Sequence, residues 1–370
     1  MANPFEKFLN FTKFALWQKK SVQVLGIDVG ASSIKVVQLR KEHGRAVLET
    51  YGEIATGPYR QLAVGQAVVL TPDKLAEAVK DLFREANVTT ASASFAIPLG
   101  SSLLVIIEIP RVSSNVLDKV VPIEARKYIP VPIGEVAIDW WPIPLQDMNP
   151  EGKNPDKLEI LVAAIHKGVI SQYQDLATRI SVVPSFFEIE TFSSIRSVFS
   201  GDMTPTAILD IGAGSTKMAI LDYGIVHVSH TIHKGSQDIT VALSRELNVD
   251  FAKAEEVKRT VGLSERLVGG GVSSTINNLM EYIFAEANRV ILDYQVKQKK
   301  TIGRIILIGG GSLLQGLIDV ATKNFEIPVV IGKPFNKVES PPFLEPVLNE
   351  AGPGFAVAIG LALRHLQNLD

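Results

Sequence analysis

The stretch LGIDVGASSIKVVQL, residues 25–39, recurs in altered form as ILDIGAGSTKMAIL at residues 208–221. Aligned on Asp28 and Asp210, the copies stand 182 positions apart, close to half of the 370-residue chain. They share Asp, Gly, Ala, Ser, Lys and Leu at matching positions. A repeat this long is not a solenoid repeat, so it indicates a duplicated fold with a site between the two halves.

Each copy has the pattern of a β-hairpin: an apolar run, a turn of small residues and a second apolar run. The small turn residues let backbone N–H groups approach an anion, and Ser and Lys add donors and positive charge. An aspartate beside a phosphate needs a cation between them, so we expect Asp28 and Asp210 to hold Mg²⁺, directly or through its waters. The expected phosphate-binding residues are Gly30, Ala31, Ser32, Ser33 and Lys35 in the first copy, and Gly212, Gly214, Ser215, Thr216 and Lys217 in the second.

A single hairpin of this kind would more often be purely structural, whereas two matching copies favour a nucleotide site. The sequence contains neither the GxxxxGK[ST] nor the GxGxxG pattern. The two Asp–Gly turns resemble the phosphate 1 and phosphate 2 motifs of the actin-like ATPases. That resemblance implies an α/β actin-like ATPase fold with two duplicated RNase H-like halves, whose hairpins clamp the phosphates of ATP and Mg²⁺ from opposite sides of a cleft.

Three further stretches of the second half have residues suited to a nucleotide. Gly235 stands at a helix entrance, where backbone N–H groups attract phosphate or ribose. Glu255 and Lys258 share a helix face and could bracket a ribose, or form part of a solvated, salt-bridged surface. A buried strand runs into a glycine turn that brings backbone close to a flat ligand, and the resemblance places adenine and ribose there. That turn contains Gly309, Gly310, Gly311 and Ser312.

One catalytic carboxylate is expected in the segment that connects the two halves. Glu190 fits this place best by its position in actin-like proteins, where it would order water around the metal. Glu188 is the second candidate, and an ordinary surface carboxylate is an equal alternative for both residues.

Composition excludes several other classes of protein. The net charge of −2 does not indicate bulk nucleic-acid binding, and the absence of cysteine excludes disulfides and thiolate metal sites. The apolar run at 102–109 is too short to span a bilayer. Residues 1–20 are aromatic and basic, which indicates a weak membrane-surface or partner helix, a frayed tail, or a helix docked on its own domain.

We expect a leader at 1–21, a first core subdomain at 22–97 plus 171–200, and an inserted subdomain at 98–170. The insertion resembles the subdomain of FtsA type, named after the cell-division protein of the actin-like group. The second core subdomain is expected at 201–240 plus 301–370, with a small subdomain over the nucleotide at 241–300. Pro122 falls inside the expected helix of the insertion, so we predict a kink or a late helix start there.

A narrower resemblance rests on the insertion. The stretches IEARKYIPVPI (residues 123–133) and EVAID (135–139), together with the opening LGID, resemble the PilM family of type IV pilus assembly. That resemblance implies a cytoplasmic ATP-binding scaffold with weak or no ATPase activity, peripheral to the inner membrane. It also implies that a groove involving residues 98–135 binds the N-terminal cytoplasmic tail of a PilN-like membrane protein. Contacts with pilus motor ATPases and self-association are two further expectations.

Two other functions fit the same residues. The chain could be an active ATPase or small-molecule kinase of this fold, which requires a carboxylate base near a substrate hydroxyl. It could instead form filaments, as its cell-division relatives do.

Overall fold

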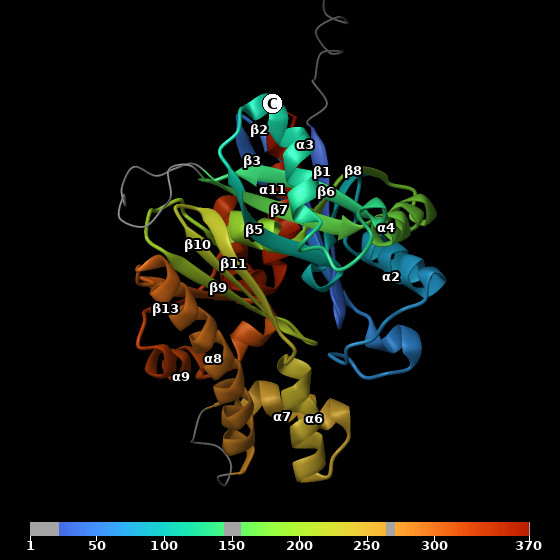
Figure 1. Cartoon of the computed structure of the whole chain (residues 1–370). Coiled ribbons are helices and arrows are strands. Elements are labelled where there is room, and N and C mark those ends of the chain that lie inside the picture. Colours follow the sequence, from blue (N-terminus) through green and yellow to red (C-terminus); the bar gives the residue numbers. More distant parts are fainter. Residues whose placement is uncertain (1–21, 144–156, 264–270, 370) are drawn as a thin grey trace, which may run out of the picture.

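The computed structural model describes residues 22–143, 157–263 and 271–369 of the chain. The expected leader at residues 1–21 lies outside the described residues. Two five-stranded sheets form the centre of the molecule (Figure 1). The first has the order β3-β2-β1-β4-β8 and the second β11-β10-β9-β12-β13.

The two sheets have the same topology. In each, the first three strands form an antiparallel meander, and two parallel strands follow on the far side of the first strand. The strands of the first sheet are β1 (Gln23–Val29), β2 (Ser33–Glu42), β3 (Arg45–Ala55), β4 (Ser92–Ile97) and β8 (Val183–Ile189). Those of the second are β9 (Thr206–Ile211), β10 (Thr216–Asp222), β11 (Ile225–Ile232), β12 (Arg304–Ile308) and β13 (Val329–Ile331). The predicted duplication and the actin-like α/β fold are confirmed.

Helices cover both faces of the first sheet. Leu25 and Ile27 of β1 pack toward helices α2 (Pro72–Glu85) and α4 (Lys167–Arg179), which lie side by side in Figure 1. Val24, on the other face, packs against helix α11 (Ala356–Gln367). Because both faces are buried, β1 is apolar along nearly its whole length instead of alternating with polar residues.

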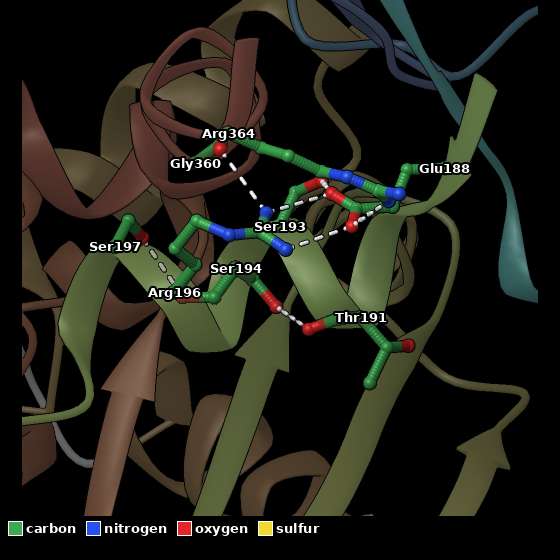
Figure 2. A network of polar contacts seen from close by, with 8 residues as sticks. All are labelled: Glu188, Thr191, Ser193, Ser194, Arg196, Ser197, Gly360 and Arg364. Atoms are coloured by element: carbon green, nitrogen blue, oxygen red, sulfur yellow. Dashed lines mark hydrogen bonds and ion pairs between the residues drawn. The ribbon is translucent and has the colours of Figure 1, made fainter. Parts of the chain in front are cut away.

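Helices α5 (Glu190–Val198) and α11 connect the two halves and cross between the sheets. A Cβ on Gly360 of α11 would overlap the carbonyl oxygen of Ser193 in α5, so the two backbones touch at this point. Glu188, only 4% exposed, accepts hydrogen bonds from Ser193 Oγ, from both terminal nitrogens of Arg196 at 2.8 Å and from Arg364 at 2.5 Å. Figure 2 shows this network, in which Arg196 also donates to the carbonyl of Gly360 at 3.1 Å.

Each half carries one insertion. The first contains strands β5 (Ser102–Pro110), β6 (Val136–Pro142) and β7 (Lys157–His166), in the order β5-β7-β6, with helix α3 (Ser114–Ala125) packed on them. The second contains helices α6 (Ser236–Leu247), α7 (Phe251–Val261) and α8 (Gly271–Gln298). Helix α9 (Leu317–Phe325) packs beside α8.

Two expectations about local structure need comment. The sequence left two outcomes for the helix that contains Pro122, a kink or a late start. The late start is wrong, because α3 begins at Ser114 and passes through the proline, and the kink stays a prediction. Pro122 stands three residues before Ala125, the last residue of α3, so its missing N–H removes only one hydrogen bond in the last part of the helix. The division into subdomains stays a prediction, but α11 packs on the first sheet although it lies within the expected second core subdomain.

The stretch Pro342–Gln367 has the length and hydropathy of a membrane span, the one such helical stretch among the described residues. About 67% of its most apolar window is buried in the protein. The apolar character of α11 is therefore explained by its position between the two sheets.

The crossing of α5 and α11 predicts the effect of Gly360→Ala. In a free helix this change would be stabilising, but here the new methyl group meets a backbone oxygen that no rotamer change can move. We expect a loss on the order of 3 kcal/mol in the free energy of unfolding, measured by urea denaturation. Gly100→Ala is the control, because nothing lies within 4 Å of that position, and equal stability of the two variants would contradict the crossing.

Candidate functional site

The two repeated stretches fold into hairpins of the same geometry. In the first, Asp28 pairs with Lys35 across β1 and β2, and in the second, Asp210 pairs with Lys217 across β9 and β10. Both turns are closed by one backbone hydrogen bond of 3.0 Å, from Gly30 N to the carbonyl of Ser33 and from Gly212 N to that of Ser215. The sequence repeat is thus a repeat of backbone conformation.

The turns face each other across a cavity of about 490 Å³. A Cβ on Gly214 would lie 3.7 Å from the Cβ of Ala31, so the two halves meet at these turns. Most of the predicted residues line this cavity. They are Asp28, Gly30, Ala31, Ser32, Ser33, Lys35, Glu190, Asp210, Gly212, Gly214, Ser215, Lys217, Glu255, Lys258, Gly309, Gly310 and Gly311.

Three predicted residues support the walls of the cavity and do not line it. Thr216 is fully buried and donates to the carbonyl of Lys234 at 2.9 Å. A Cβ on Gly235 would overlap the carbonyl oxygen of Ala213, so glycine there lets α6 begin against the second turn. Ser312 is buried and donates to the carbonyl of Gly309 at 2.7 Å, which closes the glycine turn after β12.

The carboxylates of the cavity lie close enough to affect one another. Burial raises the pKa of Asp28 to about 6, with the charge of Lys35 opposing this rise and the carboxylate of Glu190 adding to it. Burial also raises the pKa of Asp210, again against the charge of a lysine, Lys217. Carboxylates that repel one another in this way form a site suited to a divalent cation.

No group of three or more His, Asp or Glu side chains in the described part of the chain is placed to hold a metal by itself. A Mg²⁺ ion between Asp28 and Asp210 would therefore take its remaining ligands from water and from the phosphates. This matches the preference of Mg²⁺ for few carboxylates, several waters and substrate oxygens.

The two lysines have carboxylate partners. Lys35 Nζ donates to Ser33 Oγ at 2.7 Å and lies 3.1 Å from Glu53. Lys217 Nζ lies 2.9 Å from Glu190 Oε2. Burial would lower the pKa of Lys217, but the charges of Asp210 and Glu190 raise it overall, so the lysine stays protonated in the cleft.

Glu190 lies at the start of α5 and is 7% exposed. Its Oε1 accepts a hydrogen bond of 2.7 Å from Leu99 N, at the entrance to the first insertion, and its Oε2 accepts from Lys217. Glu188, the second candidate, does not line the cavity, because its carboxylate lies in the buried network of Figure 2.

Glu255 and Lys258 form a buried pair of 2.6 Å at the wall of the cavity made by α6 and α7. Glu255 also accepts from Thr240 Oγ1 at 2.6 Å. Burial lowers the pKa of Lys258, and the charge of Glu255 opposes that effect. These residues are not the solvated surface that the sequence left as an alternative.

Sequence reasoning missed other lining residues, among them the charged Glu53 and Arg259 and the loop residue Gly65. Glu53 pairs with Lys35 across β2 and β3, so the alternation of β3 could have indicated it. Gly65 reaches the cavity through tertiary packing of the loop before α2, for which the sequence has no signal.

Two sheets of duplicated topology, each opening with an Asp–Gly hairpin at a shared cleft, define an actin-like ATPase fold. The comparisons agree. The family model described as type IV pilus assembly protein PilM matches residues 26–366, and the chain belongs to that family.

Among solved structures, the chain is similar to one described as a PilM-PilN type IV pilus biogenesis complex. The identity is 27%, the TM-score is 0.78, and the match covers 93% of this chain and 98% of that one. MreB5 of Spiroplasma citri, solved bound to AMPPNP, shares the fold at 12% identity and a TM-score of 0.53, with 95% and 100% of the chains covered. The cell division protein FtsA of Neisseria meningitidis serogroup B (strain ATCC BAA-335 / MC58) is 28% identical over 148 residues. That alignment spans 34% of this chain and 36% of the relative.

The raised pKa of Asp28 predicts a gain in stability for Asp28→Asn. Between pH 4 and 6 the folded protein holds a proton that the unfolded chain has released, so the free energy of unfolding falls as pH rises through this window. Asparagine does not titrate, so the variant should not lose free energy of unfolding in this way as pH rises. At pH 7 its free energy of unfolding should exceed that of the parent by on the order of 1–3 kcal/mol, and this difference should shrink toward pH 4.

Urea denaturation without nucleotide, repeated at pH 4, 5.5 and 7, measures the effect. Asp118→Asn on the exposed side of α3 is the control and should show no such gain. A pH-independent difference between Asp28→Asn and the parent would mean that burial does not raise the pKa of Asp28 in the folded protein.

Proposed function

We propose that this protein is an ATP-binding scaffold of type IV pilus assembly, which holds Mg-ATP in the cleft between its halves. The observation that carries the proposal is the opposition of the two Asp–Gly turns, with the side chains of Asp28 and Asp210 at one cavity. The bound AMPPNP of MreB5, a protein of the same fold, supports a nucleotide as the ligand.

In this proposal the backbone N–H groups of both turns, with Ser33 and Ser215, bind the phosphates, and Lys35 and Lys217 neutralise them. Mg²⁺, held through Asp28 and Asp210, would supply the charge that lets carboxylates and phosphates share the cleft. Glu255 and Lys258 face the ribose, and Gly309, Gly310 and Gly311 bring backbone close to the base. Thr216, Gly235 and Ser312 hold these walls in place.

We infer that turnover is weak. Each oxygen of Glu190 already accepts one hydrogen bond, from Leu99 N or from Lys217, which leaves the carboxylate fewer lone pairs with which to orient a water. An active ATPase or kinase would use the remaining lone pairs to position the attacking group. Phosphate release at saturating ATP, with and without candidate substrates, separates the scaffold from the enzyme, and sedimentation with ATP tests for filaments.

We propose a peptide-binding role for the first insertion. Ile123, 70% exposed, stands on α3 with Val116, and Tyr128 and Val131 follow that helix, so four apolar side chains are open to solvent in this region. Exposed apolar groups gathered in one region suit a partner segment. The likeness to a PilM-PilN complex supports a short PilN-like cytoplasmic tail as that partner.

Such a partner would hold the protein at the inner face of the membrane, and contacts with motor ATPases and self-association belong to the same proposal. The expected subdomains, with α11 regrouped onto the first core, fit this role. The insertion then presents the peptide site while the two cores hold the nucleotide.

Asp210→Ala tests the nucleotide site. The variant loses half of the carboxylate pair for Mg²⁺, so Mg-ATP affinity measured by calorimetry should fall about tenfold or more. Glu190→Gln should keep affinity within about threefold, because the amide can still accept from Leu99 N, and should abolish any residual hydrolysis. Unchanged affinity in Asp210→Ala would refute the cleft assignment.

Ile123→Asp tests the peptide site. A charge on this exposed position should weaken binding of a PilN-like tail peptide about tenfold without changing Mg-ATP affinity, as measured by fluorescence polarisation. Val296→Asp is the matched control, since Val296 is 78% exposed on α8, outside the first insertion. Equal effects of the two variants would mean that the insertion is not the docking surface.

A further inference from the structure

A loop of the first half reaches across to the second half beside the cavity. Residues 61–70, here called the strap, lie between β3 and α2. Val68 N of the strap donates to the carbonyl of Ala31 in the first turn at 2.9 Å. Thr56 N, immediately after β3, donates to the carbonyl of Ser32 in the same turn at 3.0 Å. The strap is therefore anchored on the first phosphate turn.

The strap also contacts the second half. Its Ala67 N donates a hydrogen bond to the side-chain Oε1 of Gln237, in the first turn of α6. The backbone N–H of the same Gln237 donates to the carbonyl of Ala213 in the second phosphate turn at 3.0 Å. Gln237 is thus the link in a hydrogen-bonded path from Ala31 to Ala213, which are equivalent positions of the sequence repeat.

A second contact lies next to this path. Gly65 has φ of +88°, a conformation that favours glycine, and a Cβ there would lie 3.2 Å from the carboxyl carbon of Glu255. The backbone of the strap therefore packs directly on the side chain that lines the nucleoside end of the cavity. Gly65 itself also lines the cavity.

We propose that Gln237 and Gly65 are positioning residues that set the spacing between the two phosphate turns and hold the α6–α7 wall against the first half. The inference rests on the proposed function, because it concerns how tightly the same cleft holds ATP. A ligand enclosed by the turns, the strap and α7 leaves when the strap separates from Gln237 and Glu255. These contacts therefore control how long the nucleotide stays bound more than how fast it is hydrolysed.

Gln237→Ala removes the link but leaves the lining of the cavity unchanged, since Gln237 is not among the residues that line it. We expect release of a fluorescent ATP analogue with Mg²⁺ to become about threefold to tenfold faster in a stopped-flow chase, which is the effect of losing one hydrogen bond. Gln66→Ala is the control, because its side chain makes no hydrogen bond within the described part of the chain. Equal release rates for Gln237→Ala and the parent would overturn the proposal.

Gly65→Ala tests the second contact. The change strains the backbone and also forces a methyl group toward Glu255, whereas Gly44→Ala strains a turn with φ of +80° that has nothing within 4 Å of the new methyl group. We expect faster nucleotide release in Gly65→Ala only. A matching effect in Gly44→Ala would assign the result to general loss of stability.

The chain has no cysteine, so Ala67→Cys combined with Gln237→Cys can be cross-linked at one defined place. A short, reducible bifunctional thiol reagent is added while the fluorescent nucleotide is bound to this double variant. The cross-link should slow release of the nucleotide at least tenfold, and reduction should restore the rate of the double variant before cross-linking. Release at the uncross-linked rate while the link is intact would show that the strap does not need to open.

A measurement without nucleotide separates this inference from the proposed function. Amide hydrogen exchange of residues 61–70 should quicken in Gln237→Ala and not in Gln66→Ala, whether or not ATP is the ligand. If the parent binds no ATP but this difference appears, the proposed ligand is wrong and the positioning role of Gln237 is supported. If the parent binds ATP but exchange in Gln237→Ala equals that of the parent, the positioning role of Gln237 is wrong.

Discussion

The crossing of α5 with α11 is the constraint on which the rest of the structure depends. The chain leaves the first half through α5 and returns to it through α11, and the two backbones touch where Gly360 meets Ser193. Glu188, which is buried, joins β8, α5 and α11 through two partly exposed arginines (Figure 2). Removing the carboxylate would leave both guanidinium groups without their shared partner, so the network depends on Glu188.

The position of the cleft follows from that crossing. Glu190 begins α5 two residues after Glu188, so the same junction directs one carboxylate into the buried network and the next toward Lys217. At the other connection, Gly309 N donates to the carbonyl of Pro353 at 2.9 Å, shortly before α11 begins. The walls of the site are therefore tied to both connections between the halves.

The charged side chains of the cleft also affect the stability of the fold. Near the two turns, the carboxylates of Asp28, Asp210 and Glu190 interact with the charges of Lys35 and Lys217, and the two aspartates have raised pKa values because burial penalises their charged form. Burial of these carboxylates therefore costs stability, which a cation and phosphate bound beside them would offset. A ligand that binds only the folded state stabilises it by mass action, so nucleotide and fold would be linked in this protein.

The sequence by itself determined the duplication, the two Asp–Gly turns and the class of fold, because these rest on local backbone chemistry and on apolar patterns that neighbouring residues carry. It also determined the lining residues that belong to the repeat and to the glycine turn after β12. Only the tertiary structure decided that Glu188 serves the crossing while Glu190 serves the cleft, that Thr216, Gly235 and Ser312 lie behind its walls, and that α11 packs on the first sheet. It alone placed Gly65 beside Glu255 and Ala67 beside Gln237, from positions far apart in the chain. Contacts of this kind depend on how complete helices and sheets pack, and the close approaches at Gly360 and Gly65 leave no periodic signal in the sequence.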